Sequence, residues 1–424
     1  MTGAGTDTLH ADVLVVGAGP AGLAAAARLA AAGAGRVEVL EREAQPGGVP
    51  RHCAHGGFGT WTHPLTGPRY ARLLTEAAER AGAGLRTGVT ALDWAPTGPV
   101  LTTVGPGGPQ TLSARAVVLA TGARERPRSA RLVPGTRPAG VYTTGELQQA
   151  VHLFGQHIGT RAVVAGAADV SYAAAGTLRA AGTEVVALVT EHPRAQTSRV
   201  RAQAARLRDR VPLLTGTTVT ELLGHGRLSG VRVRHRDGRT AVLRCDTVVF
   251  TGDFVPDHEL ARRGGLALDP GTRGPAVGGT GHTSRPGVFA AGNLLHAVEP
   301  AGTAAREGAR TAGAVLDFLA GAPWPDPGVP VVVDAPLRWI APNRVVPHRV
   351  ALGRRTPAAP PAPHFLRTGI PLPRPVLYVR QDGRLLHRER PGPGTALPER
   401  TLTLTARWHD RVDPAGGEVR VSTA

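Results

Sequence analysis

The clearest pattern of apolar and polar positions lies in the first fifty residues. Asp12–Val16 is a short apolar run, typical of a buried parallel strand, and the alanine-rich stretch after it has the composition of a helix to about Ala32. A second run, Arg36–Leu40, predicts another strand. The order strand, helix, strand predicts a βαβ unit with parallel strands.

The same order of elements returns later in the chain. Arg161–Ala165 and Glu184–Val189 are apolar runs on either side of a helical stretch over Tyr172–Ala181, and Thr247–Phe250 predicts a further buried strand. Ala116–Leu119, between the two βαβ patterns, predicts a strand of the first one. The fold class expected is therefore α/β: a Rossmann-like domain with a second Rossmann-like domain inserted into it.

The last hundred residues have a different pattern, with proline-rich segments and short alternating runs. Val376–Arg380 and Arg384–Arg388 enclose Asp382-Gly383, a pair that favours a tight hairpin turn. Leu402 and Leu404 alternate with polar residues, as do Val419 and Val421. These patterns predict a small, mostly β C-terminal domain.

A length of 424 residues, at about 150 per domain, is consistent with two or three domains. We expect the first dinucleotide-binding domain in two parts, 1–139 and 256–325. The inserted domain is expected at 140–255, and the β-rich domain at 326–424.

The turn after the first strand carries a GxGxxG motif. Gly17 makes the tight turn, Gly19 allows the backbone to approach a pyrophosphate, and Gly22 allows the helix to pack closely on the strand. Glu41, 24 residues after Gly17, ends the second strand where a carboxylate accepts hydrogen bonds from a ribose. Motif, strands, helix and acid together predict dinucleotide binding.

The corresponding turn of the inserted domain departs from the motif. Gly166 is present, but Ala168 and Ser171 stand in place of the second and third glycines. Thr190, at the position that selects the ribose, carries no charge. We expect weak binding of a nicotinamide dinucleotide here, without a sharp choice between NAD and NADP.

The two cysteines, Cys53 and Cys245, lie 192 positions apart. A redox-active dithiol, a thiolate zinc site and an iron–sulfur cluster need closely spaced ligands, so none is expected, and we predict no metal site. Cys245 lies in an apolar run and is expected to pack in the core.

Charge and hydropathy limit the kinds of binding partner that the protein is expected to have. All 49 basic residues are arginine, against 32 acidic ones, which gives a net charge of +17. They are scattered along the chain with few aromatic residues, which indicates biased composition and not a nucleic-acid partner. The chain contains no run of 18 apolar residues, so no membrane insertion is expected. The first residues do not have the pattern of a signal peptide, and we expect a cytoplasmic protein.

Three blocks carry a resemblance to a known family: GGVPRHCAHGGFG, VVLATGARERPRSARLVPGTRPAGVYTTGELQ, and GLALDPGTRGPAVGGTGHTSRPGVFAAGNLLH. Together with the first motif they resemble the two-dinucleotide-domain, glutathione-reductase-like FAD/NAD(P) oxidoreductases over roughly residues 10–320. Within that superfamily they are most similar to one branch. It holds the oxidoreductases associated with glycerol-3-phosphate dehydrogenase and the flavin subunits of sarcosine oxidase, opine dehydrogenase and hydrogen cyanide synthase.

The resemblance implies FAD as cofactor, with NAD(P) as a second candidate. It places FAD against Gly17, Gly19, Ala21, Gly22, Glu41, Arg42, Gly48, Thr121, Gly122, Gly292 and Asn293. Gly166, Ala168 and Thr190 would face NAD(P).

Residues 51–63 would form a loop near the flavin, in which His52, Cys53 and His55 are the candidate catalytic residues. A histidine there can exchange protons at neutral pH. The alternatives are that the histidines only form hydrogen bonds within the loop and that Cys53 is a buried filler.

These features predict an FAD-dependent oxidoreductase. It would act as the flavin subunit of a dehydrogenase system for a small metabolite (amine, amino acid or polyol), and its redox partner would be an iron–sulfur or second flavoprotein subunit. Three alternatives stay open: a stand-alone NAD(P)H oxidase or acceptor reductase, a non-catalytic FAD-binding scaffold, and nucleic-acid binding through the net charge.

Overall fold

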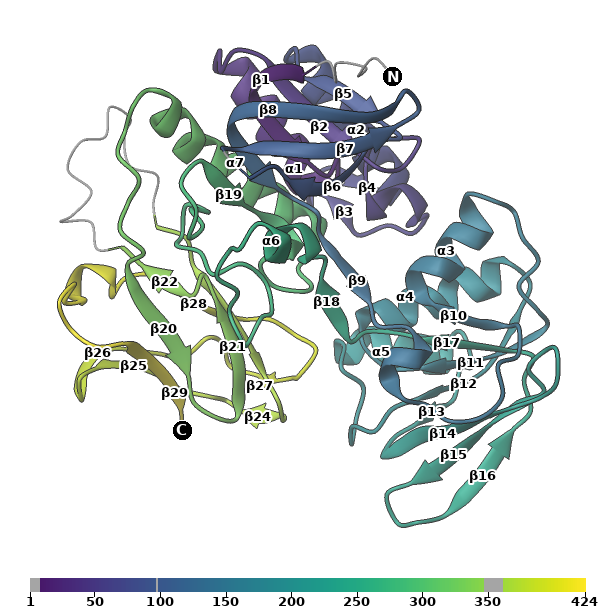
Figure 1. Ribbon diagram of the computed structural model, residues 1–424. Coiled ribbons are helices and arrows are strands. Elements are labelled where there is room, and N and C mark those ends of the chain that lie inside the picture. The colour runs from purple at the N-terminus through teal and green to yellow at the C-terminus, as the bar shows by residue number, and fades with distance from the viewer. Residues whose placement is uncertain (1–7, 97, 347–360) are drawn as a thin grey trace. The chain divides into compact units, whose positions relative to one another are not determined.

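A computed structural model describes residues 8–96, 98–346 and 361–424. The chain forms two compact units, shown in Figure 1. The first, unit 1, comprises Met1–Arg51, Phe58–Ala123 and Pro256–Ala424, and the second, unit 2, comprises His52–Gly57 and Arg124–Val255.

Unit 1 contains a seven-stranded sheet within the described residues, in the order β5-β2-β1-β8-β7-β6, with β19 beside β8. Its strands are β1 (Thr8–Val16), β2 (Val37–Glu41), β5 (Gly84–Thr87), β6 (Thr90–Trp94), β7 (Val100–Gly105), β8 (Gly108–Leu119) and β19 (Val288–Ala290). Strands β5, β2, β1, β8 and β19 run parallel to one another, whereas β7 is antiparallel to both β8 and β6. The helices of this part are α1 (Pro20–Ala31), α2 (Gly67–Arg80), α6 (Glu259–Arg263) and α7 (Ala301–Leu319).

Both faces of the parallel strands are buried, which explains their continuous apolar runs. Val13 and Val15 of β1 point to the face covered by α1, α2 and α7, and Leu14 and Val16 point to the opposite face, where α6 packs. Successive side chains of a strand alternate between its faces, so one apolar run supplies two cores.

Unit 2 repeats this plan with a parallel sheet in the order β10-β17-β11-β12-β13. Its strands are β10 (Val141–Thr143), β11 (Arg161–Ala165), β12 (Glu184–Val189), β13 (Leu213–Leu214) and β17 (Thr247–Phe250). One face packs on α3 (Thr144–His152) and α4 (Asp169–Ala180), and the other on the antiparallel strands β14 (Thr217–Leu223), β15 (Gly230–His235) and β16 (Thr240–Leu243). Helix α5 (Arg199–Leu207) has no buried residue.

The part after α7 is mostly β, as the alternating runs predict. Its sheets have the orders β22-β20-β29-β25-β26, β21-β23-β28 and β24-β27. The strands are β20 (Val329–Val333), β21 (Leu337–Ala341), β22 (Arg344–Val345), β23 (His364–Thr368), β24 (Leu372–Pro373), β25 (Leu377–Gln381), β26 (Arg384–Glu389), β27 (Thr395–Ala396), β28 (Leu402–Leu404) and β29 (Val419–Thr423). The predicted hairpin is present: Gln381 pairs with Arg384 across Asp382 and Gly383, whose φ angles are 49° and 79°.

Short elements complete the described fold. They are β3 (Phe58–Gly59), β4 (Pro64–Leu65), β9 (Ala123–Glu125), β18 (Phe254–Pro256), and the 3-10 turns η1 (Val49–His52), η2 (Arg128–Arg131), η3 (Gly292–Leu294) and η5 (His409–Arg411). Strands β9 and β18, which contain the crossings at 123/124 and 255/256, pair with each other.

The boundaries of the inserted domain differ from the expected ones. The long segment of unit 2 starts at Arg124, earlier than position 140, because residues 124–139 contact the rest of this unit. Gly135 pairs with Leu222, and Ala139 pairs with Arg227. The FAD-type part and the β-rich part both belong to unit 1, and a separate β-rich domain stays a prediction.

Candidate functional site

The dinucleotide turn of unit 1 connects β1 to α1. Gly17 has a φ of +105°, and a Cβ there would lie 2.5 Å from the carbonyl oxygen of Ala120, at the end of β8. A Cβ on Gly22 would lie 1.9 Å from the oxygen of Gly17. Helix α1 begins after Gly19 with no side-chain cap. Positions 17 and 22 therefore accept only glycine, whereas a Cβ on Gly19 would meet no atom within 4 Å. Amide groups of the first helical turn are left without a side-chain partner.

A second segment crosses this turn closely. A Cβ on Gly48 would lie 2.8 Å from Cα of Gly19, and the amide of Gly47 donates to the oxygen of Ala18 at 2.8 Å. The carboxylate of Glu41, which is 7% exposed, accepts hydrogen bonds from the amides of Ala18 and Glu43, both at 2.9 Å. The acid expected to bind ribose thus lies directly beside the turn.

The chain returns to this turn after β19. A Cβ on Gly292 would lie 2.6 Å from Cβ of Ala21, and a Cβ on Gly308 of α7 would lie 1.9 Å from the oxygen of Ala21. Ala21, Ala120, Ala291 and Ala304 form one buried cluster, so the ends of β8 and β19 and the starts of α1 and α7 meet on small side chains. Helix α7, like α1, starts without a side-chain cap.

This arrangement fits an FAD pyrophosphate. Close backbone approach at glycines, an uncapped helix start and a nearby carboxylate are the features that a dinucleotide needs. Gly17, Gly19, Ala21, Gly22, Glu41, Gly48 and Gly292 all lie around the turn. Their direct contact with FAD stays a prediction.

Three other expected FAD residues, Arg42, Thr121 and Gly122, all contact one residue, Asp257. Asp257 forms an ion pair with Arg42 through its carboxylate, with 3.4 Å between Oδ2 and Nη1. Its backbone oxygen accepts from the hydroxyl of Thr121 at 2.7 Å, and its amide donates to the oxygen of Gly122 at 2.8 Å. Asp257, which the sequence did not single out, therefore holds the Thr121-Gly122 turn. Asn293 forms its hydrogen bonds within its own loop.

Cys53 lies in the segment 52–57, which the structure groups with unit 2. It is 6% exposed, and its Sγ donates to Oε1 of Gln148 in α3 at 3.3 Å. Burial, with a smaller effect from the nearby Glu125 carboxylate, raises the pKa of the Cys53 thiol to about 12. The side chain is therefore a protonated thiol at neutral pH and not a thiolate.

The two candidate histidines of this segment differ in exposure. His52 is 7% exposed, whereas His55 is exposed and its Nδ1 lies 2.7 Å from the oxygen of Gly56. Whether either faces a flavin stays a prediction.

Glu125 is a half-buried acid whose role the sequence did not reveal. Its carboxylate accepts from the amide of Gly145 at the start of α3 (3.1 Å) and from the amide of Gly252 after β17 (2.9 Å). Burial raises the pKa of Glu125, and these hydrogen bonds oppose the shift. Because the partners lie 20 and 127 positions away, no local pattern identifies the residue.

In the second dinucleotide turn, in unit 2, the side chain of Ser171 occupies the space inside the turn. Ser171 is fully buried, and its hydroxyl accepts from the amide of Ala168 at 3.0 Å and lies 2.6 Å from that of Thr251. Helix α4 consequently begins at Asp169, three residues before the expected Tyr172. A Cβ on Gly166 would lie 2.1 Å from the Thr251 hydroxyl. The amide of Ala168, at the position where a pyrophosphate would approach most closely, therefore already donates a hydrogen bond within the turn.

A neighbouring segment also lies against this turn. The amide of Gln196 donates to the oxygen of Ala167 at 2.8 Å, and Gln196 itself is 1% exposed. Thr190 is 5% exposed at the end of β12, and its hydroxyl accepts from the amide of His192 at 3.3 Å. These contacts favour weak nucleotide binding at this site, which stays a prediction.

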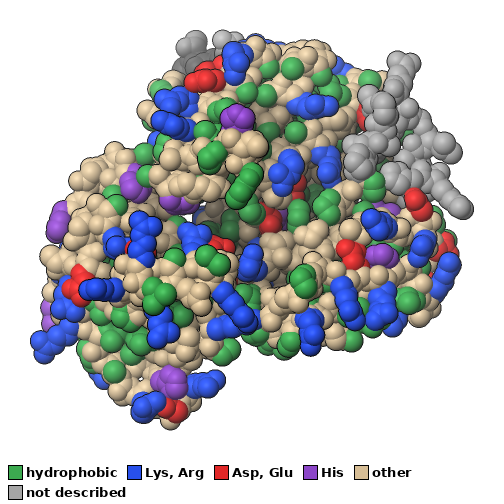
Figure 2. Space-filling model, turned by 180° about the vertical axis from the view of Figure 1, so that it is seen from behind, with side chains coloured by type: hydrophobic (Ala, Val, Ile, Leu, Met, Phe, Trp, Pro, Cys, Tyr) green, Lys and Arg blue, Asp and Glu red, His purple; other side chains and the backbone are tan. Residues whose placement is uncertain are grey.

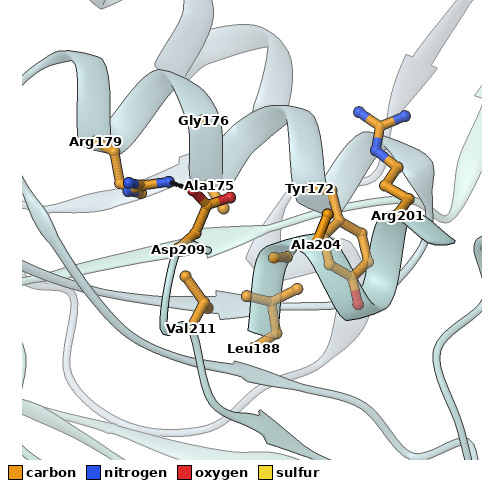
Figure 3. A pocket seen from close by; sticks show the side chains of 10 residues that line it. Tyr172, Ala175, Gly176, Arg179, Leu188, Arg201, Ala204, Asp209 and Val211 are labelled. Carbon is orange, nitrogen blue, oxygen red and sulfur yellow. Dashed lines mark ion pairs between the residues drawn. The ribbon is translucent and has the colours of Figure 1, made fainter. Parts of the chain in front are cut away.

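A pocket of about 210 Å³ lies elsewhere in unit 2, between α4 and α5 (Figure 3). Its floor is apolar, with Leu188 and Val211, and Tyr172 forms one wall. Arg179 is paired with Asp209 across it, and Arg201 pairs with Asp169 at 3.2 Å. Both arginines are thus already neutralised, and the pocket lacks the features of the dinucleotide turns.

Three properties of the described residues bear on other functions. No group of three or more His, Cys, Asp or Glu side chains in the described ranges is arranged to hold a metal ion. Among the described helices, none has the length and apolar character to cross a membrane. On the face shown in Figure 2, arginines are dispersed and interspersed with acidic residues and do not form one stripe.

Two nested parallel sheets, each with a glycine turn at the start of a helix, define the class of flavoproteins with two dinucleotide-binding domains. Comparison with known proteins agrees. The family described as pyridine nucleotide-disulphide oxidoreductase matches residues 11–308, and the chain belongs to this family. It is therefore an oxidoreductase with FAD as its cofactor, and the resemblance inferred from the sequence is confirmed.

The curated relatives differ in length from this chain. An opine oxidase subunit of Rhizobium meliloti is 28% identical over 66% of this chain and 58% of that protein. The alpha subunit of sarcosine oxidase from Corynebacterium sp. is 31% identical over 62% of this chain and 28% of that protein. Thioredoxin reductase of Mycolicibacterium smegmatis is 32% identical over 72% of this chain and 94% of that protein. The chain therefore spans less than two thirds of the first two relatives.

Solved structures support the fold. Thioredoxin reductase of T. acidophilum superimposes with a TM-score of 0.61 at 24% identity, over 73% of this chain and 98% of that one. A NAD-dependent persulfide reductase from A. fulgidus gives a TM-score of 0.55 at 22% identity, over 74% of this chain and 60% of that one. At these identities the likeness describes the architecture alone.

Proposed function

We propose that the protein is the flavin subunit of a dehydrogenase system that oxidises a small amine, amino acid or polyol. The observation that carries this proposal is the similarity to the opine oxidase and sarcosine oxidase proteins, both named as subunits of oxidases. In this proposal electrons pass between the substrate, FAD and either NAD(P) or a partner subunit that holds an iron–sulfur cluster or a second flavin.

The burial and protonation of the cysteines support electron transfer to NAD(P) or a partner subunit over transfer to a disulfide of this chain. Cys53 and Cys245 are both buried and free, and the pKa of each thiol is raised, to about 12 and about 11 respectively, chiefly by burial. A buried protonated thiol is a poor nucleophile. The chain has no third cysteine to complete a relay. Electrons that leave the flavin therefore need an acceptor other than a dithiol of this chain.

The chain's own residues bind and orient the cofactor. Bound FAD supplies the two-electron redox chemistry. In the proposal, the uncapped start of α1 holds the pyrophosphate, and the carboxylate of Glu41 accepts hydrogen bonds from the ribose. The uncapped start of α7 provides amide groups and a helix dipole that stabilise negative charge near the isoalloxazine.

Anaerobic stopped-flow spectroscopy of the purified holoprotein tests the proposal. The flavin absorbance is followed after mixing with sarcosine, an opine, proline or a polyol, and separately with NADH and NADPH. We expect one of the substrates to bleach the flavin, alone or once the partner subunit is added, and both nicotinamides to act slowly. Fast, saturable reduction by one nicotinamide alone, without any substrate response, would refute it.

The other outcomes identify the alternatives. A stand-alone NAD(P)H oxidase or acceptor reductase is favoured by the match to thioredoxin reductase, which covers 94% of that enzyme. It predicts rapid bleaching by NADH or NADPH and reoxidation by a soluble acceptor. A non-catalytic scaffold predicts bound FAD that neither nicotinamide nor any substrate reduces.

A further inference from the structure

The loop 293–300 lies between the end of β19 and the start of α7 and is closed by one side chain. Oδ1 of Asn293 accepts from the amide of Glu299 at 2.8 Å, and its Nδ2 donates to the oxygen of the same residue at 3.1 Å. Gly292, just before the loop, packs against Ala21 at the start of α1, and α7 begins at Ala301 just after it. The shape of this loop therefore sets where α7 starts relative to the dinucleotide turn.

One arginine of the C-terminal β part reaches this loop. Nη2 of Arg367, in β23, donates to the oxygen of Val298 at 2.8 Å and pairs with Oε1 of Glu299 at 3.0 Å. The hydroxyl of Thr401 donates to the same carboxylate oxygen at 2.6 Å, and Nη1 of Arg367 donates to the Thr401 oxygen. The guanidinium also lies 5.3 Å from the ring centre of Trp339.

The contact is buried on both sides. The side chains of Arg367 and Glu299 are 10% and 3% exposed. Burial lowers the pKa of Arg367, whereas the Glu299 carboxylate opposes the shift and keeps the guanidinium charged. A buried ion pair is weak evidence for stability, because the cost of desolvating both charges offsets their attraction. Its best-attested benefit is to specify one arrangement of the groups that it joins.

The same loop has a second anchor on α7. Nε2 of His296, which is 1% exposed, donates to Oε1 of Glu307 at 2.8 Å. Its ring lies against Trp339 and Phe365 of the C-terminal part, with centroid distances of 6.3 and 5.3 Å. His296 thus ties the loop to α7, and the contacts of His296 and Glu299 tie it to the β part.

We propose that Arg367 is a positioning residue for FAD: through Glu299 and Val298 it holds the loop 293–300, and so the start of α7, in the form that receives the cofactor. The C-terminal β part then serves to retain the flavin. The inference rests on FAD as cofactor and not on the identity of the electron donor or acceptor.

The test measures FAD affinity of the full-length protein. Apoprotein of wild type and variants is titrated with FAD at a temperature where each is folded, and flavin fluorescence gives the dissociation constant. Arg367→Met keeps a long side chain and removes its charge. We expect about a tenfold or larger rise in the dissociation constant for FAD, equivalent to about 1.4 kcal/mol. Arg420→Met is the control, because Arg420 lies in the same β part but pairs with the exposed Asp334. It should bind FAD like the wild type.

Two further variants separate positioning from general stability. Arg367→Met combined with Glu299→Gln leaves no unpaired buried charge, so folding should recover while FAD affinity stays low. Thr401→Val removes only the hydroxyl contact and should weaken FAD binding to a smaller extent. Wild-type affinity in the folded double variant, or in Arg367→Met with only its unfolding temperature lowered, would overturn the inference.

The assignment of FAD and the role of Arg367 fail in different ways. If wild-type apoprotein takes up no FAD, the assignment of the cofactor is wrong. If the wild type binds FAD and every Arg367 variant binds it equally well, only the role of Arg367 is wrong.

Discussion

Replacing Gly308 by alanine tests how closely α7 must approach the dinucleotide turn. A Cβ at this position would lie 1.9 Å from the oxygen of Ala21, where contacts shorter than 3.0 Å essentially never occur. The backbone of α1 or α7 must therefore move by about 1 Å, and overpacking of this kind costs about 1–3 kcal/mol. Because the atom that is met belongs to the backbone, no change of rotamer relieves the clash.

Gly313 in the same helix is a matched control, because a Cβ there meets no atom within 4 Å. Both substitutions gain the same intrinsic helix preference of alanine over glycine, about 1 kcal/mol. We therefore expect Gly313→Ala to be more stable than the wild type, and Gly308→Ala to be less stable than Gly313→Ala by about 1–3 kcal/mol.

The assay is equilibrium unfolding in urea, followed by circular dichroism, together with a titration of each apoprotein with FAD. Displacement of Ala21 also moves the start of α1, so Gly308→Ala should bind FAD more weakly, whereas Gly313→Ala should bind it like the wild type. If the two variants are equally stable and bind FAD equally well, the close approach of α7 to the turn is not what the structure describes.

Four further predictions test other parts of the molecule. Glu41→Ala should weaken FAD binding by about 1.5–3 kcal/mol for each lost charge-assisted hydrogen bond, and a colourless wild type that takes up no FAD would contradict the assignment. Neither Cys53 nor Cys245 should react with a thiol reagent in the folded protein, and both should react in urea; Cys53→Ser should keep flavin reduction within about tenfold, or 1.4 kcal/mol. Ala168→Gly should tighten NADH binding, measured by calorimetry, if the second turn faces a nucleotide, and unchanged affinity would count against that site. His364 is fully buried, and desolvation lowers its pKa from 6.5 to about 3, so its neutral form stabilises the fold above pH 6.5. In unfolding experiments this stabilisation should be lost by about 1.4 kcal/mol per pH unit as pH falls from 6.5 towards 3, and the slope should be absent in His364→Phe. A flat wild-type profile, or a slope that persists unchanged in His364→Phe, would refute it.

The chemistry behind the last prediction is specific to one histidine pair. His364 Nδ1 lies 2.7 Å from the oxygen of Pro342, which can only accept, so this nitrogen carries the proton. Its Nε2 then accepts from Nε2 of His409 at 2.8 Å. A second proton on His364 would place two N–H groups against each other, and the pair therefore opposes protonation in the folded state.

The sequence by itself determined the elements that depend on local pattern. The strands Arg161–Ala165, Glu184–Val189 and Thr247–Phe250 have the predicted bounds, because strands buried on both faces appear as continuous apolar runs. The hairpin at Asp382-Gly383 is present because its turn needs two residues with positive φ. The first glycine motif could also be identified from the sequence, since its spacing is set by one turn and one helix.

Only the tertiary structure decided how distant side chains complete these elements. Arg367 lies 69 positions from the Val298 oxygen that it binds, and Glu125 lies 127 positions from Gly252. In the sequence, Ser171 was interpreted as the replacement of a motif glycine. In the structure its hydroxyl caps α4 and contacts the hydroxyl of Thr251, 80 positions away. Periodicity reports which residues are buried along one element, but a buried polar group needs a partner that only the packing of separate elements supplies.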